Sequence, residues 1–115
     1  MLQERKNKRF KTLATALMRN AFIGGALLKD ISVSGCRIEH TMMIDVEQGK
    51  HYTVRIKPEQ DSNIGEFDLL VEACWVRPND CACEAGFSIV ESPKGKFFQR
   101  YVDYLAYRSS DAIPV

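Results

Sequence analysis

The sequence predicts a mainly β domain, in which antiparallel strands form a small barrel and one amphipathic α-helix follows them. The first observation is the alternation of Tyr52, Val54 and Ile56 with polar side chains, which is typical of a half-buried strand. The second is a longer alternation over residues 67–76. The third is a change to helical spacing near the C-terminus. Because such strands need a cover for their open end and edges, we expect the helix to plug or flank the barrel.

Length and composition are those of one globular domain. The chain has 115 residues, of which 45% are apolar, too many for a disordered protein. Residues 1–11 carry a net charge of +4, so the other residues carry −3 of the chain's total of +1. A basic arm on a slightly acidic body favours an anionic partner for the arm, and a solvated terminus is the alternative. Arg19 and Asn20 interrupt the apolar stretch after the arm, which predicts a soluble chain without a signal core or membrane span.

Residues 12–19 admit two interpretations. Phe10, Leu13 and Leu17 follow helical spacing, and the alanines and leucines of this stretch favour a helix. Alternatively, a strand would place Leu13, Thr15 and Leu17 on one face. The local pattern alone favours the helix.

The remaining strands and connections are expected in a simple order. Gly24 and Gly25 break the chain before a short apolar segment, and Cys36 and Ile38 should share one face of the strand that follows Gly35. Connections are expected at residues 20–25, 47–50, 59–65 and 77–80. Further strands are expected at residues 51–57, 67–76 and 83–89, and residues 41–46 suit either a strand or a loop.

Two long apolar faces are predicted in the second half of the chain. The strand over residues 67–76 would place five side chains on one side: Phe67, Leu69, Val71, Ala73 and Trp75. A helix is expected over residues 93–108, because Ser92 can cap it and Pro93 suits its first turn. Its apolar face would consist of Phe97, Phe98, Tyr101, Val102 and Leu105.

The four cysteines predict free thiols. Cys81 and Cys83 are separated by one residue, unlike the pairs of a zinc knuckle, and no second pair completes them. Cys36 and Cys74 lie in apolar segments, where a thiol behaves as a small hydrophobic group. We therefore expect reduced cysteines in a cytoplasmic protein, with no metal and no cofactor.

Two short motifs carry the chemistry of the chain. Arg5 and Arg9 form an Arg-x-x-x-Arg motif in the basic arm. Asp30, Ser32 and Gly35 form an Asp-x-Ser-x-x-Gly motif between two apolar segments. Taken alone, the second motif is typical of an ordinary Asx or Ser turn. The ordered pair, about 25 residues apart in a domain of this size, is more specific.

This pair of motifs resembles the PilZ family, whose members bind the bacterial second messenger cyclic di-GMP. The resemblance extends over essentially the whole chain, including the strand Gly35-Cys36-Arg37-Ile38, the segments 49–56, 73–76 and 85–87, and the closing helix. It implies a PilZ-like barrel of about six strands. It also implies a strand rather than a helix within residues 12–19, and we adopt the strand because tertiary pairing often overrides propensity.

The resemblance assigns a role to each motif residue. Arg5 and Arg9 would bind guanine edges and phosphates, because an arginine fork matches both groups. Asp30 would accept hydrogen bonds from the guanine N1–H and N2–H₂ groups. Ser32 would donate to the ligand or fix the turn, and Gly35 would supply a backbone angle that a side chain forbids.

Two further positions bear on the ligand. Trp75 matches a position where some family members stack an aromatic ring on a guanine, and the alternative is a plain core aromatic. Some members also carry an extra arginine just before the first motif arginine, which favours an intercalated ligand dimer. Glu4 stands at that position here, so the resemblance leaves open whether one or two ligands bind.

The implied function is that of a cyclic di-GMP receptor and adaptor. Residues 1–11 would be a flexible arm, residues 12–92 the barrel and residues 93–108 the helix packed on it. Ligand binding would order the arm and create a surface for an unidentified downstream protein in motility, pilus, exopolysaccharide or virulence control. The protein would be bacterial and cytoplasmic, a monomer or weak dimer, without DNA, RNA or membrane insertion.

Two other functions stay open at the level of sequence. A small barrel could bind nucleic acid through its basic arm and a stacking Trp75, although the acidic body provides no broad basic groove. A PilZ-like adaptor could also act without any nucleotide. An enzyme is not expected, because no nucleophile–base pair, paired carboxylates or metal cluster appears. His40 and His51 match no partner pattern and are expected at the surface.

Overall fold

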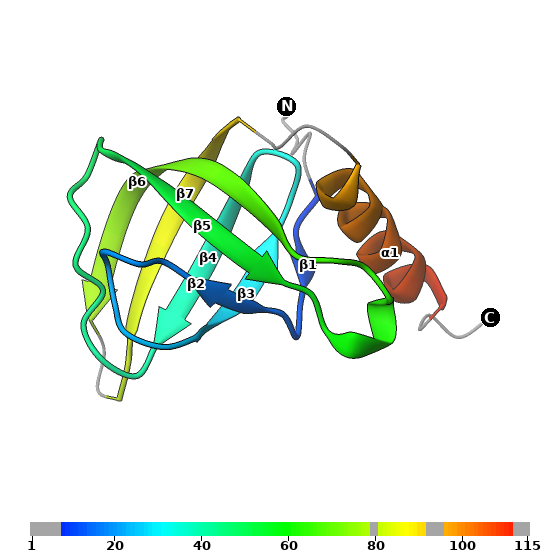
Figure 1. Cartoon of the computed structure of the whole chain (residues 1–115), viewed down its shortest axis with the longest axis horizontal. Helices are drawn as coiled ribbons and strands as arrows, with labels where there is room; N and C mark the ends of the chain where they lie inside the picture. The colour runs from blue at the N-terminus through cyan, green and yellow to red at the C-terminus, as the bar shows by residue number, and fades with distance from the viewer. Residues whose placement is uncertain (1–7, 79–80, 92–95, 112–115) are drawn as a thin grey trace, which may run out of the picture.

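A computed structural model of the chain describes residues 8–78, 81–91 and 96–111. Seven strands and one long helix make up the fold (Figure 1). The strands are β1 (Phe10–Lys11), β2 (Thr15–Leu17), β3 (Ala26–Ile31), β4 (Gly35–His40), β5 (His51–Lys57), β6 (Phe67–Pro78) and β7 (Cys83–Glu91). A 3₁₀ turn (Gln60–Ser62) connects β5 and β6, and α1 (Phe97–Asp111) ends the described chain.

Six of these strands close into an antiparallel barrel. The order is β3-β2-β5-β6-β7-β4, and β3 pairs again with β4 to complete the circle. The additional strand β1 pairs with β3 outside this ring. The expected fold class, a small antiparallel barrel with a C-terminal amphipathic helix, is therefore confirmed.

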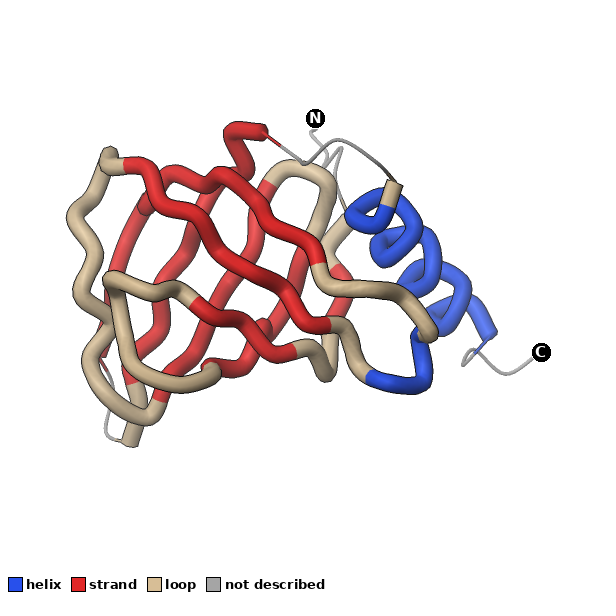
Figure 2. Tube along the Cα trace, viewed as in Figure 1, coloured by secondary structure: helices blue, strands red, loops and turns tan. Residues whose placement is uncertain are grey.

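The barrel interior and α1 form one apolar core. Leu28, Ile38, Val54 and Leu69 are completely buried inside the barrel. Helix α1 lies across one end of the barrel, next to β1 (Figures 1 and 2). The buried face of this helix contains Phe98, Tyr101, Val102 and Leu105, whereas Phe97 is largely exposed.

A charged anchor fixes α1 to the barrel. Glu59, just before the 3₁₀ turn, accepts a 2.6 Å hydrogen bond from the Tyr101 hydroxyl and a 2.8 Å bond from Arg108. Burial and the neighbouring carboxylate raise the pKa of Tyr101, so its hydroxyl stays a donor. The connection between β5 and β6 is thereby tied to the helix.

The strand register shifts at three places, and two of these β-bulges, in β3 and β6, matter for the outer face. Leu28 pairs with Ile38 and Asp30 pairs with Arg37, so Lys29 is an extra residue in β3. The same happens in β6, where Ala73 pairs with Phe87 and Trp75 with Gly86, so Cys74 is extra. A bulge reverses the alternation of side chains beyond it. Each bulge therefore changes which face of the barrel the following residues occupy.

The structure corrects several expectations. The strand within residues 12–19 is confirmed as β2, and Leu13, Thr15 and Leu17 share the more exposed face of this segment, while Ala14, Ala16 and Met18 are buried. Strand β6 continues through residues 77–78, where a turn was expected. Residues 41–46 form a loop.

The helix and one histidine also differ from expectation. The regular helix begins at Phe97, because Lys96 adopts a bend, and it continues to Asp111. Residues 92–95 lie outside the described part of the chain. His40 is buried rather than exposed, and it stacks on Phe22 with the ring centroids 4.6 Å apart. Cys36, Cys74 and Cys83 are free thiols, as predicted.

Candidate functional site

Asp30 lies on the outer side of the barrel although it is buried. Without the bulge at Lys29, the alternation that buries Leu28 would also turn Asp30 inward. The extra residue lets Leu28 and Ile31 both face the core, and the carboxylate of Asp30 between them faces outward. It is only 7% exposed because arginines cover it.

Both oxygens of the Asp30 carboxylate are paired with arginines. Arg9 donates from Nη1 to Oδ1 at 3.0 Å. Arg37 donates to Oδ2 from Nε at 2.9 Å and from Nη2 at 2.7 Å. The hydrogen bond to Asp30 raises the pKa of the Arg37 guanidinium, which is fully charged. The Asp30 carboxylate thus pairs with two guanidinium groups, and the three side chains together carry a net positive charge.

Strand pairing brings the arm to the second motif. Lys11 of β1 lies opposite Asp30 in the sheet, and Phe10 lies opposite Ile31. Arg9, directly before β1, therefore reaches Asp30 across the strand pair. Arg5 lies outside the described residues, so its expected place at the site stays a prediction.

Ser32 holds the turn between β3 and β4. It is 1% exposed, and its Oγ accepts hydrogen bonds from the backbone N–H groups of Ser34 and Gly35, each at 3.1 Å. The backbone N–H of Ser32 donates to the carbonyl of Gly35 at 2.8 Å. Of the two roles expected for Ser32, this geometry matches the fixing of the turn.

Gly35 is required for a reason other than the one predicted from the sequence. Positive φ angles among the described glycines occur at Gly24 and Gly49, and Gly35 does not share them. Instead, a Cβ at Gly35 would lie 2.8 Å from the carbonyl oxygen of Phe87, closer than real Cβ contacts. The glycine allows β4 to approach β7 at the edge of the site.

Trp75 is on the same outer face as Asp30. Plain alternation along β6 places Trp75 inward with Ala73, but the bulge at Cys74 reverses this. The indole covers Gly86 of β7 so closely that a methyl group there would overlap Cε2 and Nε1. The guanidinium of Arg77 lies 4.6 Å from the ring centroid, within the range of a cation–π contact.

A second charged cluster adjoins Trp75. Glu84 accepts a 2.8 Å hydrogen bond from Lys29 and a 3.4 Å bond from Arg77. The bond from Lys29 is the largest cause that lowers the pKa of Glu84, and the same bond raises the pKa of Lys29. This cluster ties β3, β6 and β7 together across the outer face.

A hollow of about 590 Å³, the Asp30 hollow, joins these groups. Arg9, Asp30, Gly35 and Trp75 line it, and Ser32 lies just beneath its turn. Additional lining residues are Ser34, Cys36, Arg37, Cys74, Gly86, Phe87 and Ser88. Burial raises the pKa of the Cys36 thiol to about 12, so this thiol is protonated and unreactive. The hollow has the size of a small-molecule site.

Arg37 is the main site residue that the motifs do not include. It follows the second motif directly, and the pairing of a short hairpin places it opposite Asp30. Residues of opposite charge stabilise a strand pair when they lie opposite each other, so the sequence already contained a signal for the contact between Asp30 and Arg37. Ser88 and Gly86, by contrast, could not be assigned to the site from the sequence, because only the pairing of β7 with its neighbours places them there.

A comparison with protein families decides the identity of the fold. The model for the PilZ domain matches residues 3–105. The chain belongs to the PilZ domain family. This is a family of cyclic di-GMP receptors, and the match includes both motifs. A comparison with curated protein sequences finds no match.

Solved structures share the PilZ fold at low sequence identity. The inhibitor of motility MotI (DgrA) from Bacillus subtilis has a TM-score of 0.78 at 16% identity, over 97% of this chain and 54% of that chain. The chain thus spans about half the length of MotI. The PilZ domain of YcgR from Escherichia coli, solved with c-di-GMP, has a TM-score of 0.70 at 15% identity, over 96% and 100% of the two chains. PlzA from Borreliella burgdorferi, in complex with c-di-GMP, has a TM-score of 0.56 at 8% identity, over 92% and 48%.

The described residues contain neither a membrane-spanning helix nor a cluster of metal-ligating side chains. No helix there is long and apolar enough to cross a membrane. No group of three or more His, Cys, Asp or Glu side chains in this part of the chain could hold a metal ion.

Proposed function

We propose that this PilZ domain is a cyclic di-GMP receptor that signals to a partner protein. The observation that carries the proposal is the Asp30 carboxylate, which the bulge turns to the outer face and two arginines hold there. It acts as an adaptor in the bacterial cytoplasm, in motility, pilus, exopolysaccharide or virulence control, and catalyses no reaction.

Guanine recognition follows from the chemistry of this carboxylate. The N1–H and N2–H₂ groups of guanine form a pair of parallel donors, as an arginine fork does. A guanine can therefore replace one of the arginines at Asp30. Arg9 is the one that leaves, because it makes one bond to Asp30 and Arg37 makes two. The released guanidinium then meets a phosphate or the O6 and N7 atoms of guanine.

Trp75 supports the proposal from the neighbouring strand. Its indole lines the same hollow and lies flat over Gly86, so a base can stack on its outer face once Arg77 moves aside. Stacking contributes about 1–3 kcal/mol per base. The cyclic dinucleotide would also bind Arg5 when the arm closes over it.

The signal reaches the helix through Arg9. This residue lines the Asp30 hollow and also a smaller hollow of about 360 Å³ that it shares with Leu105, Arg108 and Ser109 of α1. When the ligand draws Arg9 and β1 into a new position, the contact between β1 and α1 changes too. The altered helix end and the ordered arm then distinguish the ligand-bound form from the free form.

Calorimetry with cyclic di-GMP tests this function. The wild type should bind, and Asp30→Asn should weaken binding about 30-fold or more, because loss of one partner of a buried charge pair costs about 2–5 kcal/mol. Arg9→Ala should also weaken binding. Asp68→Asn is the matched control, since Asp68 pairs with Arg55 on another part of the barrel surface and should leave affinity unchanged.

Three results of this experiment would be decisive. A wild type that shows no heat at high micromolar ligand is not a receptor. Equal binding by the wild type and Asp30→Asn would mean that the ligand binds elsewhere. The measured stoichiometry answers whether one or two ligands bind per chain.

A further inference from the structure

An apolar surface occupies the end of the barrel that is remote from α1. Strand topology places the β2–β3 and β4–β5 connections together at that end (Figure 1). Ile23 is 93% exposed on the first connection, and Met42 and Met43 are 70% and 68% exposed on the second. Clustered exposed apolar side chains are typical of a protein-binding surface.

Hydrogen bonds hold the two connections against each other. The N–H of Asp45 donates to the carbonyl of Ala21 at 2.9 Å. His40 accepts the N–H of Met42 on Nδ1 at 3.0 Å, and its Nε2 lies 3.1 Å from the carbonyl of Ile23. The imidazole thus bridges both connections. The apolar side chains are therefore presented on a fixed backbone.

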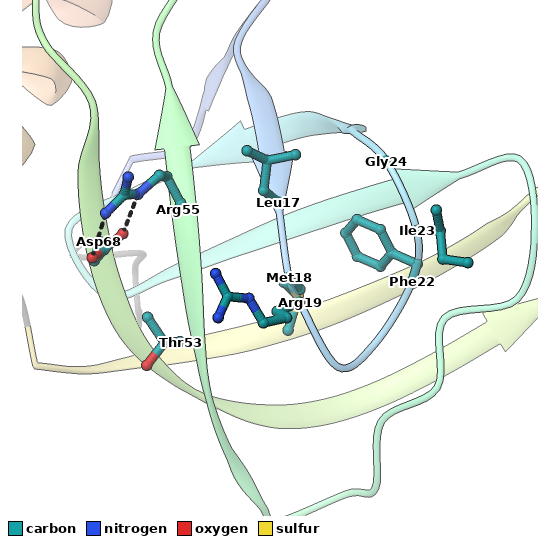
Figure 3. A pocket seen from close by; sticks show the side chains of 9 residues that line it. All are labelled: Leu17, Met18, Arg19, Phe22, Ile23, Gly24, Thr53, Arg55 and Asp68. Atoms are coloured by element: carbon teal, nitrogen blue, oxygen red, sulfur yellow. Dashed lines mark hydrogen bonds and ion pairs between the residues drawn. The ribbon is translucent and has the colours of Figure 1, made fainter.

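A groove continues from this surface along the outside of β2 and β5. We call it the β2–β5 groove, and it encloses about 690 Å³, more than the Asp30 hollow. Its apolar walls are Leu17, Met18, Phe22 and Ile23. In Figure 3 the Arg55–Asp68 pair lies on one side, Phe22 on the other, and Arg19 extends between them.

The charge of the groove comes from Arg19. Arg55 and Asp68 neutralise each other through two hydrogen bonds of 2.9 and 3.2 Å, and the first of these lowers the pKa of Asp68. Arg19 is exposed, and none of the residues that the structure describes forms an ion pair with it. An apolar groove with one unpaired guanidinium is complementary to an apolar segment that carries a carboxylate.

The composition of this surface supports a protein partner. Protein interfaces are enriched in methionine, aromatic residues and arginine, and depleted in lysine and glutamate. Methionine also adapts its shape to different partners. Two of the chain's four methionines, Met42 and Met43, are exposed here, and Arg19 and Phe22 line the groove beside them.

We propose that the β2–β5 groove, with Met42 and Met43 beside it, binds an acidic apolar segment of the partner protein. A leucine, methionine or phenylalanine of that segment enters the groove, and an aspartate or glutamate next to it pairs with Arg19. The inference deepens the adaptor role proposed above, on which it rests. It involves none of the residues that line the Asp30 hollow, so the two can fail separately.

Peptide selection tests the groove directly. A display library of random short peptides, selected on the wild type, should enrich sequences in which Asp or Glu stands beside Leu, Met or Phe. Arg19→Glu should weaken the enriched peptide about tenfold or more, because it turns an attraction into a repulsion. Arg100→Glu, at an exposed position on α1, is the matched control and should bind as the wild type does.

The NMR signals of the methionine methyl groups show where the peptide binds. The peptide should shift the methyl signals of Met18, Met42 and Met43 and leave the Trp75 indole signal unchanged. Ile23→Ser is a second variant that should fold normally, because its side chain is almost fully exposed, and it should also weaken the peptide. Cyclic di-GMP should bind Arg19→Glu with wild-type affinity.

Several results would overturn the proposal. These are failure to enrich any peptide, enrichment without acidic residues, equal losses in Arg19→Glu and Arg100→Glu, or shifts confined to Trp75. If the wild type sediments as a dimer and Arg19→Glu as a monomer, the groove binds a second copy of the chain instead. Peptide binding without cyclic di-GMP binding would reject the receptor function alone, and the converse would reject the groove alone.

Discussion

At the scale of single residues, the site depends on where Asp30 and Trp75 point. Both would face the core if their strands alternated without interruption, and both lie outward because one extra residue precedes each. Asp30 then meets two arginines, and Trp75 covers a glycine. The base-recognising carboxylate and the stacking ring of the proposed receptor thus come from the same local device.

Gly86 is the residue that allows Trp75 to lie on the sheet. Gly86→Ala would place a methyl group against the indole, so we expect Trp75 to be displaced, with a stability loss of about 1–3 kcal/mol. Tryptophan emission should shift to the red, and urea denaturation should give the stability. Cyclic di-GMP affinity should fall as well.

Gly49→Ala separates this effect from a general cost of replacing glycine. Gly49 has a φ of 88° and open space around it, so alanine there costs about 1–2 kcal/mol of backbone strain without touching Trp75. The tryptophan emission of Gly49→Ala should match that of the wild type. If Gly86→Ala also leaves the emission unchanged, the indole does not depend on Gly86.

At the scale of elements, a cluster of ion pairs on the outer face connects three strands of the barrel. Glu84 of β7 holds Lys29 of β3 and Arg77 of β6. Lys29 is the bulged residue next to Asp30, so the same carboxylate that joins the strands also fixes the bulge. The geometry of the site is therefore coupled to this cluster.

The cluster makes part of the stability depend on pH. The pKa of Glu84 is lowered in the folded chain from its ordinary 4.5, so its contribution is present above about pH 4.5 and is lost as the pH falls through the lower folded value. Glu84→Gln should be less stable than the wild type by about 1 kcal/mol at pH 7, and the difference should shrink below pH 4.5. Urea denaturation at a series of pH values measures it.

The exposed ion pair of Glu47 and Lys50 provides the control for Glu84→Gln. Glu47→Gln removes an exposed partner of Lys50 and should change the free energy of unfolding very little at any pH. A difference between the wild type and Glu84→Gln that stays constant from pH 7 to pH 3 would show that the charge of Glu84 is not what stabilises the strands.

The elements with long patterns could be predicted from the sequence, and the short or irregular ones could not. Strand β5 and the main part of β6 follow strict alternation, and α1 follows helical spacing, because each buries one continuous face. Strand β2 has only three residues, too few for a period, and its strand character comes from pairing with β3 and β5.

The site was predictable as a set of motif residues but not as a geometry. Asp30 and Arg9 carry the motifs, and strand pairing brings them together. The bulge at Cys74 leaves no mark in the apolar pattern, because Ala73, Trp75 and Val76 are all apolar. Alternation alone therefore groups Trp75 with the buried side chains, whereas the resemblance to the family places it at the ligand, on the outer face where it lies in the structure. Arg37 was not expected in the site, although it follows the second motif directly and pairs with Asp30 across the β3–β4 hairpin.

At the scale of the whole molecule, the barrel carries two distinct surfaces. The Asp30 hollow lies on β3, β4, β6 and β7, and the β2–β5 groove lies across β2, β5 and the start of β6. A closed ring of strands separates them. We propose that the Asp30 hollow binds the nucleotide, that the β2–β5 groove binds the partner, and that α1 responds to the arm at the barrel end.

The most direct test of the central claim uses the only tryptophan of the chain, Trp75. Cyclic di-GMP is titrated into the wild type, Asp30→Asn and Asp68→Asn while the tryptophan fluorescence is recorded. We expect a saturable change in the wild type and Asp68→Asn, and a loss of that change in Asp30→Asn over the same ligand range. No saturable change in the wild type, or the same change in Asp30→Asn, would contradict the claim that Asp30 and Trp75 form the nucleotide site.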